Sequence, residues 1–347
     1  VPQNVLDSLA TSQIGHRTPE FSDLMEGIVK GIQKVLYTEN RVYLASNPAT
    51  ALWEMSTTNS VKKGVLHAVN GAFSGKWATV SESCGLKTKR LNIEWGSGVN
   101  AQDVDMILSS GEYDVFAMVH NETSTGAQSN LEDISLMMRE KHPNVIWLVD
   151  AVSSMAGSRI ELDRLGIDYI LSSTQKAWGL PAGFSVFSVS DRFREVSKTI
   201  DNKGYYFDLA VYDKYYEKMQ TPSTPSIAHM FGMRYVLEQI EKEGLDERWD
   251  RHIQMADTAR GWALNRGQSL FPESGCESNT ITCIRNDQEW DINAVNDRLL
   301  ERGYRMDRGY GKLRCRAFRI AHMGNVTPGL LSEYLGVFDE VLKEVSK

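Results

Sequence analysis

Short apolar runs alternate with amphipathic stretches along the first half of the chain. Apolar runs occupy Arg41–Ser46, Gly64–Val69 and Asp114–His120, and stretches with helical spacing, such as Leu131–Glu140, separate such runs. The nearly continuous apolar character of Asp114–His120 is typical of a parallel strand that is covered on both faces. The repeated strand-then-helix order therefore predicts an α/β domain, with a mostly parallel sheet flanked by helices.

The pattern changes after about residue 183. The apolar run Gly183–Ser190 follows the preceding strand too closely for a helical crossover, so we expect it to pair antiparallel. The link Gln220–Pro225 contains two prolines and is expected to be extended. Helices and two short strands follow it. We therefore predict a large domain over residues 1–240 and a small C-terminal α+β domain over residues 241–347.

Composition narrows the possible functions. A chain of 347 residues exceeds the usual size of one core, and its net charge of −7 disfavours a nucleic-acid surface. No apolar run reaches the ~18 residues that a membrane span needs. We expect a cytoplasmic protein that binds no metal, nucleic acid or membrane. The cysteines lack zinc-ligand spacing and read as free thiols; they are Cys84, Cys276, Cys283 and Cys315.

Two polar residues follow neighbouring strands in the middle of the chain. Asp150 ends the apolar run that begins near Asn144, and Lys176 lies on the loop after the next short strand. In an open α/β sheet, ligands bind outside the carboxyl ends of the strands. An amine that can form an imine and a carboxylate that keeps a ring nitrogen protonated suit pyridoxal phosphate chemistry. Taken singly, each residue is also compatible with an ordinary strand end or surface loop.

Other candidates follow other strands or precede helices. Ala49 and Thr50 open a helix, whose free N–H groups favour an anion, although a Thr-capped turn has the same pattern. Phe73, between glycines, is either a stacking ring or a core residue. The pair His16-Arg17 precedes a proline-started helix and is either an anion site or a solvated loop. Arg319 is either a carboxylate clamp or part of a basic edge strand.

Three motifs in order resemble a known family. His120-Asn121-Glu122-Thr123-Ser124-Thr125-Gly126, then Val149–Ser154, then Ser173-Thr174-Gln175-Lys176 are similar to motifs of the class V aminotransferases, in the fold type I group of pyridoxal phosphate enzymes. The resemblance is colinear over nearly the whole chain. Within the class, the loop Gly15–Phe21 and the link Gln220–Pro225 resemble phosphoserine aminotransferase most.

This resemblance implies how the chain would hold pyridoxal 5'-phosphate. Lys176 would carry the cofactor covalently, and Asp150 would pair with its pyridine nitrogen. Thr123 would bond the ring hydroxyl, and Phe73 would stack on the ring, where many relatives have Trp. The cofactor's phosphate would be held by Ala49, Thr50 and Gln175, together with Thr221 and Thr224 of a neighbouring subunit. The resemblance therefore also implies a homodimer with shared active sites.

The resemblance likewise implies a substrate site. Arg319 would bind the α-carboxylate, while His16 and Arg17, in an N-terminal segment of residues 1–18, match contacts to a substrate phosphate. The family's implied reaction is transfer of an amino group between small amino and keto acids. We expect O-phospho-L-serine and 2-oxoglutarate to give 3-phosphohydroxypyruvate and L-glutamate, a step of serine biosynthesis. The basic residues near Arg319 favour such a doubly anionic substrate; they are Lys312, Arg314 and Arg316.

Three alternatives stay open. The pair His16-Arg17 also occurs in serine– and alanine–glyoxylate aminotransferases, which are the main alternative. A lyase of the cysteine-desulfurase type needs a reactive thiol, and near Arg319 only Cys315 is available, in what reads as a strand. A non-catalytic protein on the same scaffold is the third reading, because a fold alone does not guarantee activity. The presence of both Lys176 and Asp150 counts against it.

Overall fold

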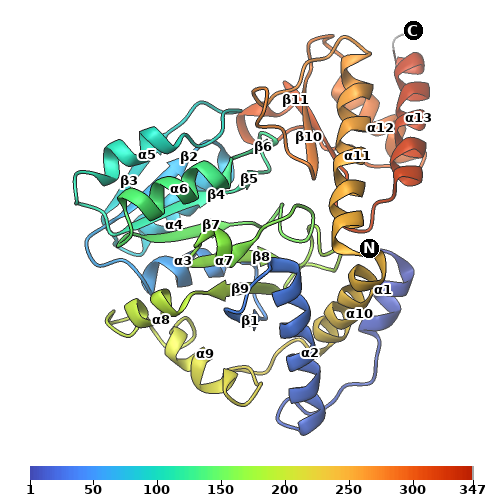
Figure 1. Cartoon of the computed structure of the whole chain (residues 1–347). Coiled ribbons are helices and arrows are strands. Elements are labelled where there is room, and N and C mark those ends of the chain that lie inside the picture. Colours follow the sequence, from blue (N-terminus) through green and yellow to red (C-terminus); the bar gives the residue numbers. More distant parts are fainter. Residues whose placement is uncertain (346–347) are drawn as a thin grey trace.

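A seven-stranded sheet forms the centre of the computed structural model, which describes residues 1–345 (Figure 1). The strands in spatial order are β1 (Arg41–Ala45), β9 (Ser185–Val189), β8 (Tyr169–Ser173), β7 (Ile146–Asp150), β4 (Val115–Val119), β2 (Val65–Val69) and β3 (Thr88–Asn92). Only β9 runs against its neighbours, β8 and β1, and all other pairings are parallel. The predictions of a mostly parallel sheet and of an antiparallel strand after residue 183 are confirmed.

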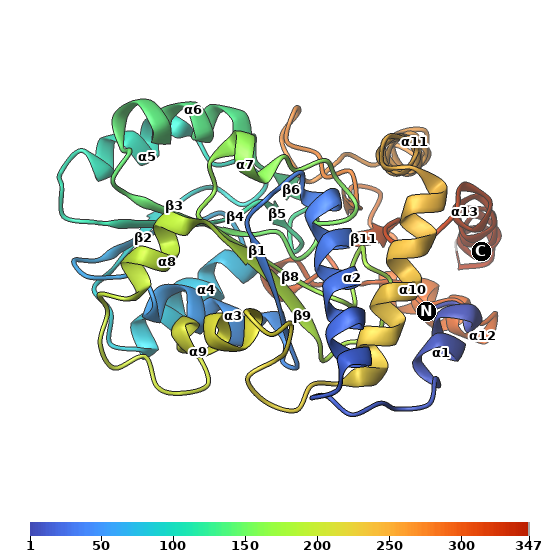
Figure 2. The same ribbon diagram turned by 60° about the horizontal axis from the view of Figure 1, so that its bottom comes forward.

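Helices cover both faces of this sheet. One face carries α2 (Pro19–Leu36), α5 (Ala101–Leu108), α6 (Leu131–Lys141), α7 (Leu162–Leu165) and α10 (Ile227–Glu243). The other carries α3 (Ala49–Thr58), α4 (Ala72–Ser83), α8 (Asp191–Ser197) and α9 (Leu209–Tyr216). Figure 2 shows α5, α6 and α7 opposite α3, α4 and α9. In β7, Trp147 and Val149 join the first core while Ile146 and Leu148 join the second, which explains the continuous apolar runs.

The C-terminal part has a core of its own. It contains α11 (Leu245–Leu264), α12 (Ile292–Glu301), a short 3-10 helix (Gly311–Leu313) and α13 (Pro328–Val345), packed on the antiparallel pair β10 (Ile281–Arg285) and β11 (Ala317–Ala321). Trp262, Phe318 and Phe338 form the aromatic centre of this core. The α+β character agrees with the prediction. The proposed boundary between residues 240 and 241 stays a prediction, and residues 346–347 of the small domain lie outside the described part.

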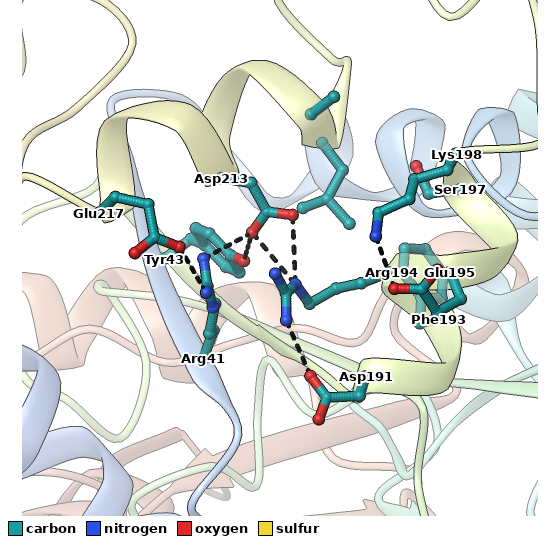
Figure 3. A network of polar contacts seen from close by, with 12 residues as sticks. Arg41, Tyr43, Asp191, Phe193, Arg194, Glu195, Ser197, Lys198, Asp213 and Glu217 are labelled. Carbon is teal, nitrogen blue, oxygen red and sulfur yellow. Dashed lines mark hydrogen bonds and ion pairs between the residues drawn. The ribbon is translucent and has the colours of Figure 1, made fainter.

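A polar network fastens α9 to the edge of the sheet (Figure 3). The carboxylate of Asp213 on α9 accepts hydrogen bonds from the Tyr43 hydroxyl, from Arg41 at 3.2 Å and from Arg194 at 3.2 Å. Burial and the neighbouring carboxylate raise the pKa of Tyr43, so its hydroxyl stays protonated and donates. The network fixes the end of α9, from which the chain enters the link Gln220–Pro225.

Some elements have no clear signal in the sequence. The helices α1 (Gln3–Leu9), α7 and α8 are all short. The strands β5 (Asn121–Glu122) and β6 (Ala127–Gln128) form a small hairpin within the first motif. Cys315 lies in a turn with a positive φ of 60°, not in the strand that the sequence predicted. Among residues 1–345, none of the helices has the length and apolar character that crossing a membrane requires.

Candidate functional site

A cavity of about 210 Å³ opens at the carboxyl ends of the parallel strands. It is where the topology of such a sheet places a ligand. Seven of the predicted site residues lie on its wall, namely Ala49, Thr50, Phe73, Thr123, Asp150, Gln175 and Lys176. The remaining lining residues are Pro48, Trp53, Lys76, Val119, Asn121 and Val152. The structure therefore brings together side chains from the ends of β4, β7 and β8 and from the starts of α3 and α4.

Asp150 is a buried carboxylate at the end of β7. The backbone N–H of Val152 donates to its Oδ1 at 2.7 Å, and the indole N–H of Trp53 donates to its Oδ2 at 2.7 Å. Burial raises the pKa of Asp150 to about 6, although both hydrogen bonds act to lower it. Both donors are neutral, and each carboxylate oxygen has a second lone pair. The acid is thus suited to accept a further N–H that carries a positive charge.

Lys176 lies on a tight loop between β8 and β9. The loop is closed by backbone hydrogen bonds, including Gly179 N–H to Lys176 O at 2.9 Å. Burial lowers the pKa of Lys176, and the positive charge of Arg319 lowers it further, while Asp150 and Asp307 act in the opposite direction. A lowered pKa increases the fraction of neutral amine, which is the form that attacks a carbonyl carbon.

The loop that carries Lys176 is also held by the small domain. Arg248 on α11 is buried and donates to the carbonyl of Ala177 at 2.9 Å and to that of Ala156 at 2.7 Å. Its third partner is the carboxylate of Glu243 at 2.8 Å. Because a guanidinium is planar with several fixed donors, one side chain can bridge three acceptors in this way.

Glu122 organises the opposite wall of the cavity. Its carboxylate is fully buried and accepts the backbone N–H groups of Ser74 at 2.9 Å and Ser124 at 3.1 Å, as well as both serine hydroxyls. These bonds tie the start of α4, which carries Phe73, to the loop that carries Thr123. Gly71 is required at this contact, because a Cβ there would lie 2.3 Å from Cγ of Glu122.

The first turn of α3 forms the end of the cavity that suits an anion. Ala49 and Thr50 are its first residues, and the first N–H groups of a helix have no partner within the helix. Gln175 and Lys76 lie on the same cavity wall. Free N–H groups, a hydroxyl, an amide and a nearby amine together are suited to a phosphate group.

Arg319 on β11 does not line the cavity, but it contacts a residue that does. Its guanidinium donates to the carbonyl of Thr123 at 2.7 Å and forms an ion pair with Asp307. On the same loop as Asp307, Tyr310 stacks on Phe73 with ring centroids 5.0 Å apart and planes at 24°. The small domain thus contacts both the cavity's stacking ring and its hydroxyl-bearing loop.

Besides Arg319, four predicted residues do not line this cavity. Arg17 donates to the carbonyl of Thr221 at 2.8 Å, and its guanidinium lies over the ring of Tyr215. Thr221 in turn donates from its hydroxyl to Ser223 O at 2.8 Å. His16 and Thr224 belong to the same two loops, and neither lines the cavity. Their expected roles toward a neighbouring subunit or a substrate phosphate stay predictions.

Several contributing residues were missed by sequence reasoning. Trp53 is one helical turn after Thr50, and Lys76 is one turn after Phe73, so i,i+3 spacing from the predicted residues could have indicated both. Asp307 and Arg248 had no such signal, because distant parts of the chain bring them to the site.

The donor set fits pyridoxal 5'-phosphate. Asn121 lines the cavity, and its Oδ1 is buried without a hydrogen-bond partner. Buried polar atoms are normally satisfied, so this oxygen indicates a missing donor. A buried carboxylate with neutral donors, an amine with a lowered pKa, an aromatic ring and a helix start complete what this cofactor needs.

The family model of class-V aminotransferases matches residues 5–309. The chain belongs to this family. An uncharacterised aminotransferase of Methanocaldococcus jannaschii is 33% identical over 93% of this chain and 85% of its own length. A serine–glyoxylate aminotransferase of Arabidopsis thaliana is 29% identical over 99% of this chain and 88% of its own. Among solved structures, an alanine–glyoxylate aminotransferase from Nostoc sp. has a TM-score of 0.91 at 29% identity, covering 98% of this chain and 92% of that one.

The class-V aminotransferase described here is thus a pyridoxal phosphate-dependent enzyme of fold type I. When bound, the cofactor supplies an electron-accepting ring that stabilises negative charge at the substrate's Cα. The expected resemblance to phosphoserine aminotransferase in particular is not supported. The relatives from Arabidopsis thaliana and Nostoc sp. are named for glyoxylate, which agrees better with the alternative derived from the sequence.

Proposed function

We propose that this class-V aminotransferase transfers the amino group of serine or alanine to glyoxylate. One structural observation supports this over phosphoserine as the substrate. Two of the three basic residues expected to assist Arg319, Lys312 and Arg316, line a separate pocket with Trp95 and Phe271. Arg319 instead bonds to the backbone of Thr123, which lines the cavity that holds Lys176. A substrate with one carboxylate needs one cationic clamp, and Arg319 is the cation proposed for it.

The proposed roles follow from where the side chains lie. Lys176 would take the proton from the substrate's Cα, which requires a neutral amine, and burial lowers its pKa accordingly. The buried carboxylate of Asp150 would keep the ring nitrogen protonated. Phe73 would pack against the ring, Thr123 would bond its hydroxyl, and Arg319 would orient the α-carboxylate. Ala49, Thr50 and Gln175 would hold the cofactor's phosphate.

A homodimer is part of the proposal. Thr221 and Thr224 lie outside this chain's own cavity, in a link that α9 and the Asp213 network hold in place. In the proposed dimer they complete the phosphate site of the neighbouring subunit. His16 and Arg17, beside the same link, then lie near that shared site.

A paired-substrate assay tests the substrate assignment. Rates are measured for serine with glyoxylate, alanine with glyoxylate, and phosphoserine with 2-oxoglutarate, with Lys176→Ala protein as the blank. We expect either glyoxylate pair to exceed the phosphoserine pair in kcat/KM by at least about 10-fold, since an unpaired substrate phosphate in the site is unfavourable. Faster turnover of phosphoserine would overturn the proposal and restore the reading that the sequence first favoured.

Arg17→Ala provides a second, independent measurement. If the substrate carries no phosphate, the substitution leaves the KM for serine nearly unchanged. If phosphoserine is the substrate, loss of this cation raises its KM by about 10-fold or more. The same variant therefore separates the two readings by whether the KM of the substrate changes.

A further inference from the structure

Arg319 already has a carboxylate partner within its own chain. Its Nε donates to Oδ1 of Asp307 at 2.8 Å, and its Nη2 donates to Oδ2 at 2.5 Å. This is the two-point arrangement in which a guanidinium binds a free carboxylate. Nη1 donates to Thr123 O at 2.7 Å. Of the five N–H groups of Arg319, the fork best suited to a substrate carboxylate is therefore occupied by Asp307.

The two partners differ in their access to solvent. The side chain of Arg319 is 8% exposed, whereas that of Asp307 is 43% exposed. The arginine is thus fixed in the wall of the site, while the acid reaches it from the solvent side. An entering anion can approach the pair from the side on which Asp307 lies. Water weakens an ion pair whose acid is this exposed and rehydrates the acid when it leaves, so the exchange costs little free energy.

Apart from the ion pair, Asp307 is held by one hydrogen bond to its carboxylate and by one to its backbone. The N–H of Gly309 donates to Oδ1 of Asp307 at 2.9 Å, and the backbone of Asp307 pairs with that of Arg319 through Arg319 N–H at 3.1 Å. Gly309 has a φ of 82°, and a Cβ there would lie 2.4 Å from two carbonyl oxygens. Since the backbone pairing does not involve the carboxylate, the side chain can leave Arg319 without unpairing the strand.

We propose that Asp307 occupies the carboxylate clamp of the resting enzyme and that the substrate's carboxylate displaces it. Asp307 is then an internal competitor that sets the apparent affinity for substrates and disfavours those with a second negative charge. This inference rests on the proposed role of Arg319 in binding the α-carboxylate. Tyr310, three residues further on, stacks on Phe73, so the loop that carries the competitor also contacts a residue that lines the cavity.

The test is the affinity for propionate, a monocarboxylate that cannot react. Its dissociation constant is measured by ligand-observed NMR on the holoenzyme and on the cofactor-free protein, so that the readout does not depend on turnover. The variants are Asp307→Asn, Asp307→Ala and Arg319→Leu. Asp297→Asn is the matched control, because it makes the same chemical change at an exposed position on α12 of the same domain.

We expect both Asp307 variants to bind propionate about 3- to 10-fold more tightly, as removal of a partly exposed competing ion pair allows. Asp297→Asn should bind like the wild type, and Arg319→Leu should bind more weakly. Two variants of Asp307 are compared because either alone could alter the loop, and a melting curve shows that each is folded.

Two outcomes overturn different statements. If Arg319→Leu weakens binding but the Asp307 variants weaken it or leave it unchanged, Asp307 supports the orientation of Arg319 and the displacement is wrong. If Arg319→Leu has no effect on propionate binding, the proposed role of Arg319 is wrong, and with it this inference. The first of these outcomes does not contradict the proposed transamination of serine with glyoxylate, which its own assay tests.

Discussion

The hydrogen bond from Trp53 to Asp150 gives the sharpest prediction for the cofactor site. Trp53→Phe keeps an aromatic ring in the core and removes the indole N–H, which donates at 2.7 Å to a buried carboxylate oxygen. The matched control is Trp77→Phe. Trp77 stacks on Trp53 and is equally buried, but its N–H donates to the carbonyl of Trp53 at 3.3 Å and not to the acid.

The expected size follows from the burial of the acid. A hydrogen bond to a charged group contributes about 1.5–3 kcal/mol, which corresponds to a change of about 1–2 in the pKa of Asp150. The pKa is about 6 in the wild type, and removal of a donor to the carboxylate raises it. At about pH 7, the ionised fraction then falls from ~90% to between ~10% and ~50%. Only the ionised acid pairs with a protonated ring nitrogen.

The assay is the dissociation constant of pyridoxal 5'-phosphate as a function of pH. For Trp53→Phe, we expect the affinity for pyridoxal 5'-phosphate at about pH 7 to fall by about 2- to 10-fold. We also expect the pH below which the cofactor is lost to rise by about 1–2 pH units. The sign follows from linkage: an acid with a raised pKa takes up its proton at a higher pH, so the carboxylate form is lost earlier on acidification.

The control variant separates the loss of the hydrogen bond from the loss of packing. Trp77→Phe should lower stability but leave the pH profile of cofactor affinity in place. If both variants shift the profile equally, or if neither does, the bond from Trp53 does not maintain the charge of Asp150.

Three further predictions concern the lysine and the contacts that hold it. Lys176→Ala protein reconstituted with pyridoxal phosphate should lack the visible absorption band of the lysine-bound cofactor, as a spectrum will show; a persisting band would exclude Lys176 as the attachment site. In denaturant titrations, Arg248→Lys should lower the free energy of unfolding by about 2–4 kcal/mol, because a lysine ammonium does not reproduce the fixed fork that bridges the three acceptors. The control Arg234→Lys, in an exposed ion pair, should change the free energy of unfolding by less than about 1 kcal/mol. Glu122→Gln should lower the free energy of unfolding by about 2–4 kcal/mol in the same titration and weaken cofactor binding, because an amide NH₂ would face N–H donors. An unchanged denaturation midpoint would show that the carboxylate of Glu122 does not hold these segments together.

Much of the fold could be predicted because its signals are local. The two cores on either side of β7 leave a continuous apolar run in the sequence, and the short interval before β9 excludes a crossover. Asp150 and Lys176 could also be predicted, because they follow neighbouring strands and so must meet at one edge of the sheet. Ala49, Thr50 and Phe73 were placed by the same reasoning, and each lines the cavity.

The rest could not be predicted because it depends on contacts between distant segments. Asp307 reaches Arg319 through a turn whose course depends on Gly309, and nothing in the letters near either residue indicates an ion pair. The basic run around Lys312 was expected to assist Arg319. The 3-10 helix and the turn after it instead direct Lys312 and Arg316 to another pocket. Charged residues that are close in sequence predict a cluster of charges in space only when the local backbone conformation is known.

The contacts of Arg248 have a mechanical consequence. This side chain on α11 is bonded to the carbonyl of Ala177, next to Lys176, and a Cβ added at Gly324 would lie 3.2 Å from the carbonyl oxygens of Lys176 and Ala177. The C-terminal part and the loop that carries Lys176 are therefore joined by a direct bond and by a fit that leaves little room for a side chain at Gly324. A displacement of α11 would be transmitted through Arg248 to the backbone beside Lys176.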